Sequence, residues 1–345
     1  MRAVVYKAPH RLSIEERERP VPGPGEALVQ VTATGICGSD VHGYTGETGR
    51  RALGMVMGHE FSGRLVDFGP DTDPPEGWYE TAEYALNPVI ACWECVYCLA
   101  GHNQQCVKRR LMGVTPDIIG SYADYVVLPV RNANPLGDGV SADWGALVEP
   151  LSVGFHAVGR SGVGPGMQLV IIGAGPIGIA VLLAARRVGA GPVIVSEPHE
   201  GRRAIAAGYD AVTIDPVNES LSERVREVTG PLGSGHVIDA VGSRRTLPDS
   251  LSVVAPEGTL VLLGMHEPLL EFNSYALSVP ERQIAGSFCY SEEEFSSTAR
   301  WVAQAPRDLE GYVGGEVGYD GIGERFATLA AGGDAALKVL FKPAI

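Results

Sequence analysis

The sequence is poor in positive charge. Its 27 lysine and arginine residues are outnumbered by 41 aspartate and glutamate residues, which gives a formal net charge of -14. Such a chain repels a phosphate backbone, and its adjacent arginine pairs, such as Arg109–Arg110 and Arg244–Arg245, are scattered rather than grouped in one stripe. We therefore expect no binding to nucleic acid.

The sequence also lacks a long uninterrupted apolar run. Nothing near the N-terminus has the apolar core of a secretory signal peptide, so we expect a cytoplasmic protein. One membrane-like segment without charges, residues 169–185, is slightly shorter than a membrane span and contains Pro176 and several glycines. We interpret it as a buried strand followed by a buried helix, and we expect no association with a membrane.

Cysteine is scarce, and four of the six cysteines are crowded into one segment: Cys92, Cys95, Cys98 and Cys106. Two-residue gaps let successive thiolates surround one zinc ion, and a more distant fourth thiolate closes the tetrahedron. The spacing predicts a structural zinc site that is closed to substrate. A pair of disulfides is the alternative, and the lack of a secretory signal disfavours it.

A chain of 345 residues is long enough for two domains. Residues 1–150 are predicted to be rich in strands, because apolar alternation at 27–31 and 61–66 is typical of half-exposed strands. Short unbroken apolar runs then alternate with helix-like segments, which predicts an α/β domain with a doubly wound parallel sheet over 151–285. We expect residues 286–345 to return to the first domain.

A glycine-rich motif, Gly173-Ala174-Gly175-Pro176-Ile177-Gly178, follows the first apolar run of the second domain. The first glycine permits a tight turn, the second lets a pyrophosphate approach, and the third lets the following helix pack closely. The phosphates would then meet the N-terminus of that helix. The motif predicts a dinucleotide site.

Glu197 ends the next apolar run, at the position where a carboxylate can bind the adenosine ribose. A carboxylate there would also repel a 2'-phosphate, so we expect NAD rather than NADP as the cofactor. Arg202 and Arg203 are the counter-argument, since an arginine near this position can bind that phosphate. A solvated helix face is the alternative role for both arginines.

A second set of possible metal ligands lies earlier in the chain. Cys37 offers a thiol, His59 an imidazole, and Glu60 and Glu149 offer carboxylates. Three protein ligands are enough for a catalytic zinc ion, because its fourth position is left for water or substrate.

Together these motifs resemble the zinc-dependent medium-chain alcohol dehydrogenases, especially the branch of sorbitol, threonine and 2,3-butanediol dehydrogenases. The resemblance covers nearly the whole chain and rests on five motifs in the family's order: Cys-Gly-Ser-Asp-x-His at 37–42, Gly-His-Glu at 58–60, the four cysteines, Glu-Pro-Leu at 149–151 and the glycine motif. It implies a GroES-like catalytic domain, a Rossmann domain, one catalytic and one structural zinc ion, and a homo-oligomer, either tetramer or dimer.

The resemblance also implies roles for individual residues. Cys37 and His59 would bind the catalytic zinc, with either Glu60 or Glu149 completing the ligand sphere directly or through water. Ser39 would contact the substrate hydroxyl, and a proton relay would end at His42. This assignment suits the chemistry, because imidazole can release a proton near neutral pH whereas a hydroxyl can only pass one on.

Two segments depart from the family pattern. Residues 79–86 replace the usual Gly-Asp-Arg-Val element, which affects local packing rather than the ligands. Near the C-terminus Tyr290 is kept as a candidate substrate contact, but Cys289 stands where sorbitol dehydrogenases have arginine. A sorbitol-like contact is therefore missing.

The expected function is the reversible NAD-dependent oxidation of a secondary alcohol to a ketone, in a polyol, vicinal diol, cyclitol or sugar derivative. A 3-hydroxy amino acid such as threonine is the alternative substrate, although no specific anion anchor is evident. From another class, a zinc-free quinone reductase relative or a catalytically silent nucleotide-binding homologue would be expected to lack Cys37 or His59. Both residues are present.

Overall fold

The computed structural model describes residues 1–345 except 48, 50, 305, 333–335 and 345. The chain divides into two compact units: unit 1 contains Met1–Glu149 and Ser291–Ile345, and unit 2 contains Pro150–Tyr290. The backbone hydrogen bond from Ser287 to Leu262 prolongs the sheet of unit 2 beyond its last strand. Residues 286–290, which the sequence analysis placed in the first domain, therefore belong to unit 2.

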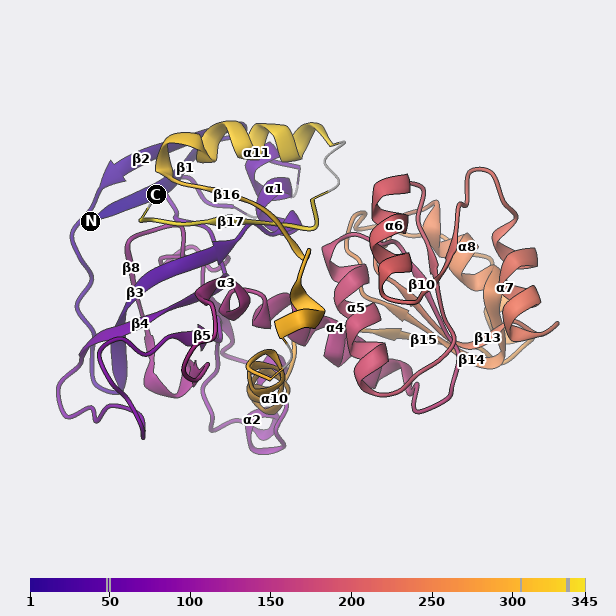
Figure 1. The fold of residues 1–345 in the computed structure, drawn as a ribbon, viewed down its shortest axis with the longest axis horizontal. Coiled ribbons are helices and arrows are strands. Elements are labelled where there is room, and N and C mark those ends of the chain that lie inside the picture. Colours follow the sequence, from indigo (N-terminus) through magenta and orange to yellow (C-terminus); the bar gives the residue numbers. More distant parts are fainter. Residues whose placement is uncertain (48, 50, 305, 333–335, 345) are drawn as a thin grey trace. The chain divides into compact units, whose positions relative to one another are not determined.

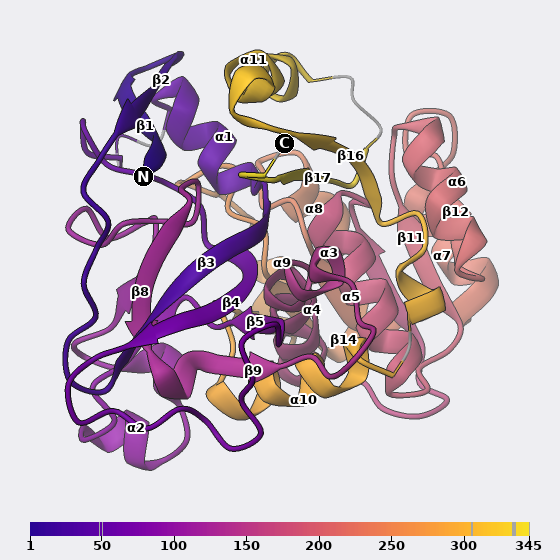
Figure 2. The ribbon, with the colours of Figure 1, turned by 60° about the vertical axis from the view of Figure 1, so that its left-hand side comes forward.

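Unit 1 is built around a seven-stranded sheet with the order β16-β17-β3-β4-β5-β9, in which β8 also pairs with β3. Figure 2 shows β3, β4 and β8 side by side, with β16, β17 and α11 in yellow. The strands of unit 1 are β1 (Arg2–Ala8), β2 (Arg11–Glu16), β3 (Glu26–Gly35), β4 (Glu60–Phe68), β5 (Tyr84–Leu86), β6 (Val89–Ile90), β7 (Arg110–Leu111), β8 (Tyr125–Pro129), β9 (Ala133–Pro135), β16 (Val313–Val317) and β17 (Lys338–Phe341). Its helices are α1 (Gly38–Thr45), α2 (Val96–Leu99), α3 (Ala142–Gly145), α10 (Glu292–Val302) and α11 (Ile322–Ala331).

The strands predicted at 27–31 and 61–66 are confirmed as parts of β3 and β4. The expectation that they are half exposed is wrong for β3, in which Gln30 is exposed but most side chains are buried. One face of β3 contributes Val29 and Val31 to a core shared with β4, β5 and β8, and Ala33 packs against Ala146 and Leu340. The strand is central in its sheet, so alternation in its sequence does not correspond to contact with water.

The two ends of the chain share one hydrophobic core in unit 1. Val4 and Val5 of β1 pack with Tyr122, with Phe326 of α11 and with Phe341 of β17. Strand β17 also pairs antiparallel with β3, with Leu340 opposite Gly35. The C-terminal segment is thus part of the sheet that carries the motif at 37–42.

Unit 2 contains a six-stranded parallel sheet with the order β12-β11-β10-β13-β14-β15, which is the 3-2-1-4-5-6 order of Rossmann domains. Figure 1 shows helices on both sides of this sheet. Its strands are β10 (Leu169–Ile172), β11 (Val193–Ser196), β12 (Val212–Ile214), β13 (Ser234–Asp239), β14 (Val254–Leu262) and β15 (Gln283–Gly286). Its helices are α4 (Val148–Ser161), α5 (Pro176–Arg187), α6 (Glu200–Gly208), α7 (Leu221–Thr229), α8 (Thr246–Val253) and α9 (Tyr275–Ser278).

The prediction of a strand-rich domain joined to a doubly wound α/β domain is confirmed. Residues 169–185 form β10 and most of α5, as expected for a buried strand that leads into a buried helix. Among the described helices, none is long and apolar enough to cross a membrane.

The turn between β10 and α5 depends on two glycines. Gly173 has φ +95°, a left-handed conformation that favours glycine. Gly178 lies so close to the turn that a Cβ atom built on it would be 1.9 Å from the carbonyl oxygen of Gly173. Gly175 differs from both, because a Cβ atom there would meet no heavy atom within 4 Å.

We predict that Gly178→Ala destabilises the nucleotide-free protein by about 1–3 kcal/mol, because α5 must move away from β10 to admit the methyl group. Gly175→Ala is the matched control and should change the free energy of unfolding by no more than about 0.5 kcal/mol. Denaturant unfolding of both variants without nucleotide makes the comparison. Equal stability of the two variants would contradict this account of the turn.

Candidate functional site

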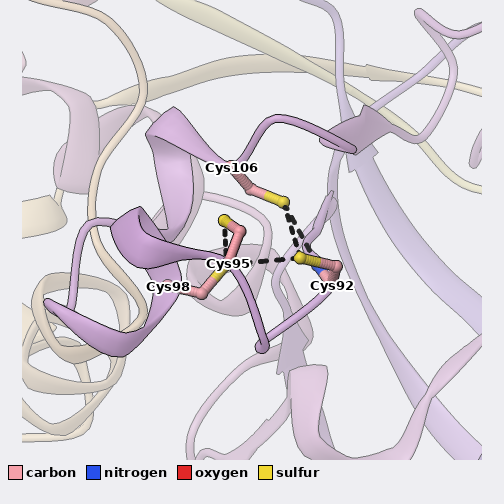
Figure 3. Close-up of side chains that lie close together, drawn as sticks. All are labelled: Cys92, Cys95, Cys98 and Cys106. Atoms are coloured by element: carbon pink, nitrogen blue, oxygen red, sulfur yellow. Dashed lines mark hydrogen bonds between the residues drawn. The ribbon is translucent and has the colours of Figure 1, made fainter.

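The four clustered cysteines lie within reach of one ion. Their sulfur atoms are all within 4.8 Å of one another, with Cys92–Cys106 at 3.4 Å, Cys95–Cys98 at 3.6 Å and Cys92–Cys98 at 4.0 Å (Figure 3). Thiolates 2.3 Å from a tetrahedral zinc ion are about 3.8 Å apart. All four thiols are free, so the arrangement fits zinc and does not contain the alternative pair of disulfides.

Backbone amides stabilise negative charge in this cluster. Amides of Cys98 and Val107 lower the pKa of Cys95 to about 6, and the amides of Cys92 and Lys108 donate to the sulfur of Cys106. Burial has the opposite effect at Cys98 and raises the pKa of that thiol to about 12. Thiolate is the form that binds metal, so the loop that carries Cys95 and Cys106 is arranged for metal binding.

Trp93 connects the cysteine loop to α10. Its indole nitrogen donates to Glu292 at 3.1 Å, and Arg131 both pairs with Glu292 and lies over the indole ring at 4.2 Å. The loop is therefore fastened to the segment of unit 1 that follows unit 2 in the chain.

The second possible metal site arises where β3 ends and β4 begins. The antiparallel register places Gly35 opposite Glu60, so Cys37, just after β3, lies near His59 and Glu60. One ligand atom from each of these three residues lies within 4.8 Å of the others. A thiol, an imidazole and a carboxylate form a donor set that suits zinc and leaves one position open.

Glu60 has a buried partner that the sequence analysis missed. The Nζ atom of Lys338, in β17, lies 2.8 Å from Oε1 and 2.7 Å from Oε2 of Glu60, and both side chains are 1% exposed. Burial by itself would lower the pKa of Lys338, but the charge of Glu60 and its hydrogen bond to Lys338 raise it above its usual value. Lys338 is therefore charged at neutral pH.

Burial strongly raises the pKa of the Cys37 thiol, and the charge of Glu60 adds to this effect. Lys338 opposes it, as does the hydroxyl of Ser39, which donates to the Cys37 sulfur at 3.4 Å. A bound cation would also favour the thiolate. The protein groups around Cys37 therefore disfavour a thiolate on balance, and a bound divalent cation would supply the positive charge that a thiolate needs.

Asp40 is a further buried carboxylate at this site. Its Oδ2 atom lies 3.6 Å from Nδ1 of His59, and the side chain is bonded by Arg51 and Tyr122. The sequence analysis quoted Asp40 within its motif but gave no role to these three residues. Their contacts join different parts of the chain, and no local pattern marks them. Lys338 did leave a signal, because it is a single charge in the apolar run Leu337–Phe341.

The proposed relay residues both lie on α1. Ser39 is next to the Cys37 sulfur, and His42 is one helical turn further along. The Nδ1 atom of His42 lies 2.9 Å from the exposed carboxylate of Glu47, and the imidazole is 37% exposed. The relay from Ser39 to His42 stays a prediction.

Two predicted site residues lie outside this cluster. Glu149 is buried in the first turn of α4 and contributes to the raised pKa of Lys338, but it is not in the group of Cys37, His59 and Glu60. Tyr290 is buried and belongs to unit 2, so its role as a substrate contact stays a prediction.

In unit 2, Glu197 follows β11 next to the glycine turn. Its Oε2 atom accepts a hydrogen bond from the amide of Ala174 at 2.7 Å, and its Oε1 atom accepts from the amide of His199. Arg203 is held by Asp215 at 3.0 Å and by the carbonyls of Glu197 and Pro198. The carboxylate is thus fixed beside the turn, while the guanidinium of Arg203 is held by Asp215 and by the backbone next to Glu197.

Comparison with known proteins agrees with this division. A family model described as alcohol dehydrogenase GroES-like domain matches residues 23–138, and one described as zinc-binding dehydrogenase matches residues 176–304. The chain is 30% identical to L-galactonate-5-dehydrogenase of Escherichia coli (strain K12), over 88% of each chain. It is 32% identical to D-xylulose reductase A of Aspergillus niger, over 95% of this chain and 93% of the relative. A zinc-binding dehydrogenase from Sinorhizobium meliloti 1021 bound to NADP has a TM-score of 0.89 at 29% identity, over 99% of each chain.

We predict that Lys338→Met destabilises the protein by about 3–5 kcal/mol, because it leaves the carboxylate of Glu60 buried without a counter-charge. The double variant Lys338→Met/Glu60→Gln should recover much of this loss, since it removes both charges. Denaturant unfolding of the single and double variants under identical metal conditions measures the difference. A single variant as stable as the parent would show that the charge of Glu60 does not depend on Lys338.

Proposed function

This chain belongs to the zinc-binding dehydrogenases of the alcohol dehydrogenase type, oxidoreductases that act on CH–OH groups, and we propose which substrate and residues it uses. The proposed reaction is the reversible oxidation of a secondary alcohol to a ketone, in a polyol, vicinal diol, cyclitol or sugar derivative, with hydride transfer to NAD. The observation that carries this proposal is the buried cluster of Cys37, His59 and Glu60 beside Ser39.

We assign Cys37, His59 and Glu60 as the residues that would hold the catalytic zinc ion. Glu60 is favoured over Glu149, because Glu60 alone of the two lies in the cluster. Zinc bound there would act as a Lewis acid and lower the pKa of the substrate hydroxyl. Ser39 would accept the proton of that hydroxyl while it gives up its own, and His42 would take up the released proton and pass it to solvent, since an imidazole can take up and release a proton near neutral pH.

The names of the relatives support a polyhydroxylated substrate. One relative is named for a sugar acid and the other for a ketose, which is the product of oxidising a polyol at a secondary carbon. A threonine-type substrate has no comparable support. A catalytically silent homologue would have no need of the thiol, imidazole and carboxylate that are brought together here.

The preference for NAD rests on Glu197. Its carboxylate is buried beside the glycine motif (Gly173–Gly178), where it would accept hydrogen bonds from the adenosine ribose and repel a 2'-phosphate. Arg203 is engaged by Asp215, and Arg202 is kept as the candidate arginine for a contact with the cofactor. The Sinorhizobium neighbour binds NADP, so the fold by itself does not decide between NAD and NADP.

A homo-oligomer, either dimer or tetramer, is part of the proposal. Strand β15 lies at the edge of its sheet and pairs with β14 alone among the described strands. Met265, Tyr275 and Val279, which precede it in the chain, are 64%, 75% and 77% exposed. An open strand edge beside exposed apolar side chains is typical of an interaction surface.

A cytoplasmic location is also proposed. None of the six cysteines takes part in a disulfide, which is the state that a reducing compartment maintains.

We predict two zinc ions per chain and NADH formation from at least one polyol, diol, cyclitol or sugar acid in a substrate panel. Cys37→Ser should lose one zinc ion and nearly all turnover while its melting temperature stays near that of the parent. Cys98→Ser, the matched control, should lose the other zinc ion and melt at a lower temperature, because the four-cysteine site stabilises a loop. Elemental analysis, absorbance at 340 nm and thermal unfolding test this. Full turnover in Cys37→Ser would refute the assignment.

We also predict that the parent prefers NAD to NADP in kcat/KM and that Glu197→Ala narrows the preference by at least tenfold. The change removes two hydrogen bonds to a charged acceptor and one electrostatic repulsion, which together amount to a few kcal/mol. The kinetics of parent and variant with both cofactors give the answer. If the parent prefers NADP, Arg202 becomes the candidate phosphate ligand.

A further inference from the structure

We propose that Arg51 and Tyr122 are positioning residues for the catalytic metal, because they hold the Asp40 carboxylate against His59 and so fix the imidazole that binds zinc. This inference rests on the proposed function, which assigns His59 as a ligand. Both residues lie outside the metal-binding motifs, and each contacts a different oxygen atom of Asp40.

Both oxygen atoms of the Asp40 carboxylate are occupied. Arg51 donates to Oδ1 at 3.1 Å, and the hydroxyl of Tyr122 donates to Oδ2 at 2.9 Å. Asp40 has no exposed surface, so its charge depends on these partners. The carboxylate therefore cannot rotate without breaking one of the two contacts.

Oδ2 of Asp40 is also the atom that faces His59. It lies 3.6 Å from Nδ1 of the imidazole, and Nδ1 is buried with no hydrogen-bond partner among the described residues. A small movement of the ring would bring Nδ1 into hydrogen-bonding distance of this oxygen, which leaves Nε2 to bind the metal. Carboxylates commonly orient a metal-binding imidazole in this way and fix its tautomer.

The side chain of Arg51 packs against α1 at Gly43, where the helix has no side chain, and so reaches Asp40. A Cβ atom on Gly43 would be 2.5 Å from Cγ and 3.0 Å from Nε of Arg51, so the arginine passes where residue 43 has no side chain. The Arg51 side chain is only 5% exposed. Arg51, which lies between α1 and His59 in the sequence, is thereby held against α1 by a buried contact.

Each of the two carboxylates at the site has its own cationic partner. Arg51 balances Asp40, and Lys338 balances Glu60. The carboxylate that orients His59 is therefore kept distinct from the carboxylate proposed to bind zinc, because each has its own buried cation.

Tyr122→Phe tests this proposal, and Tyr319→Phe is its matched control. Each hydroxyl has its one proton within hydrogen-bonding distance of a carboxylate and of a backbone carbonyl: Asp40 and Gly35 for Tyr122, and Asp124 and Arg2 for Tyr319. Both rings pack edge-on against Phe341 in the same core. The two substitutions thus remove bonds of the same kind, buried at Tyr122 and partly buried at Tyr319, and only Tyr122→Phe touches Asp40.

The measurement is the loss of Zn²⁺ from the full-length protein to a chromogenic chelator, together with the free energy of unfolding. We expect Tyr122→Phe to weaken retention of one of the two zinc ions by about tenfold or more, the usual effect of losing a group that orients a metal ligand. Tyr319→Phe should retain both ions as the parent does, at similar stability. Equal zinc retention in the two variants would overturn the proposal.

Gly43→Ala displaces Arg51 without removing any polar group, and alanine favours the helix more than glycine does. It should therefore weaken retention of the same zinc ion. Gly323→Ala in α11, where a Cβ atom meets nothing within 4 Å, is the control and should have no effect. Unchanged retention in Gly43→Ala would exclude Arg51 from the role.

The parent protein separates this inference from the proposed function. If the parent holds two zinc ions and Cys37→Ser holds one, the proposed metal site stands and the variants decide on Arg51 and Tyr122. If the parent holds only one zinc ion, which Cys98→Ser removes, both the metal site and the inference fail.

Discussion

The site in unit 1 depends on one buried ion pair, that of Glu60 with Lys338. Removing two charges from water is costly, and a buried pair is retained only where the geometry is good and both charges are satisfied. Both oxygens of Glu60 face the ammonium group, and a Cβ atom on Gly35 would lie 2.1 Å from one of them. The carboxylate is thus held over the point where β3 ends, and the possible metal ligands gather there.

The same principle extends to the second carboxylate. Asp40 and Glu60 are both buried carboxylates. Arg51 forms an ion pair with Asp40, and Lys338 forms one with Glu60. Because the charges are separately paired, a thiolate from Cys37 and a divalent cation can be added without leaving a carboxylate uncompensated.

The sequence was sufficient to predict the parts of the protein that are encoded locally. The four cysteines, the glycine motif and the alternation of strands and helices in unit 2 each lie in short segments, and the fold they predicted is the one observed. Lys338, Arg51 and Tyr122 could not be assigned in this way, because each meets its partner through tertiary packing across strands or loops. The burial of β3 was missed for the same reason, since it depends on neighbours contributed by distant segments.

The hydrogen bond between Trp93 and Glu292 can form only late in the synthesis of the chain. These two residues are 199 positions apart in the chain, and all of unit 2 lies between them. A nascent chain that has just emerged beyond its cysteines can bind zinc in the loop, but it cannot yet anchor that loop. Unit 2 has its own continuous sheet and can fold in the interval. The cysteine loop therefore reaches its contact with α10 only after all of unit 2 has been synthesised.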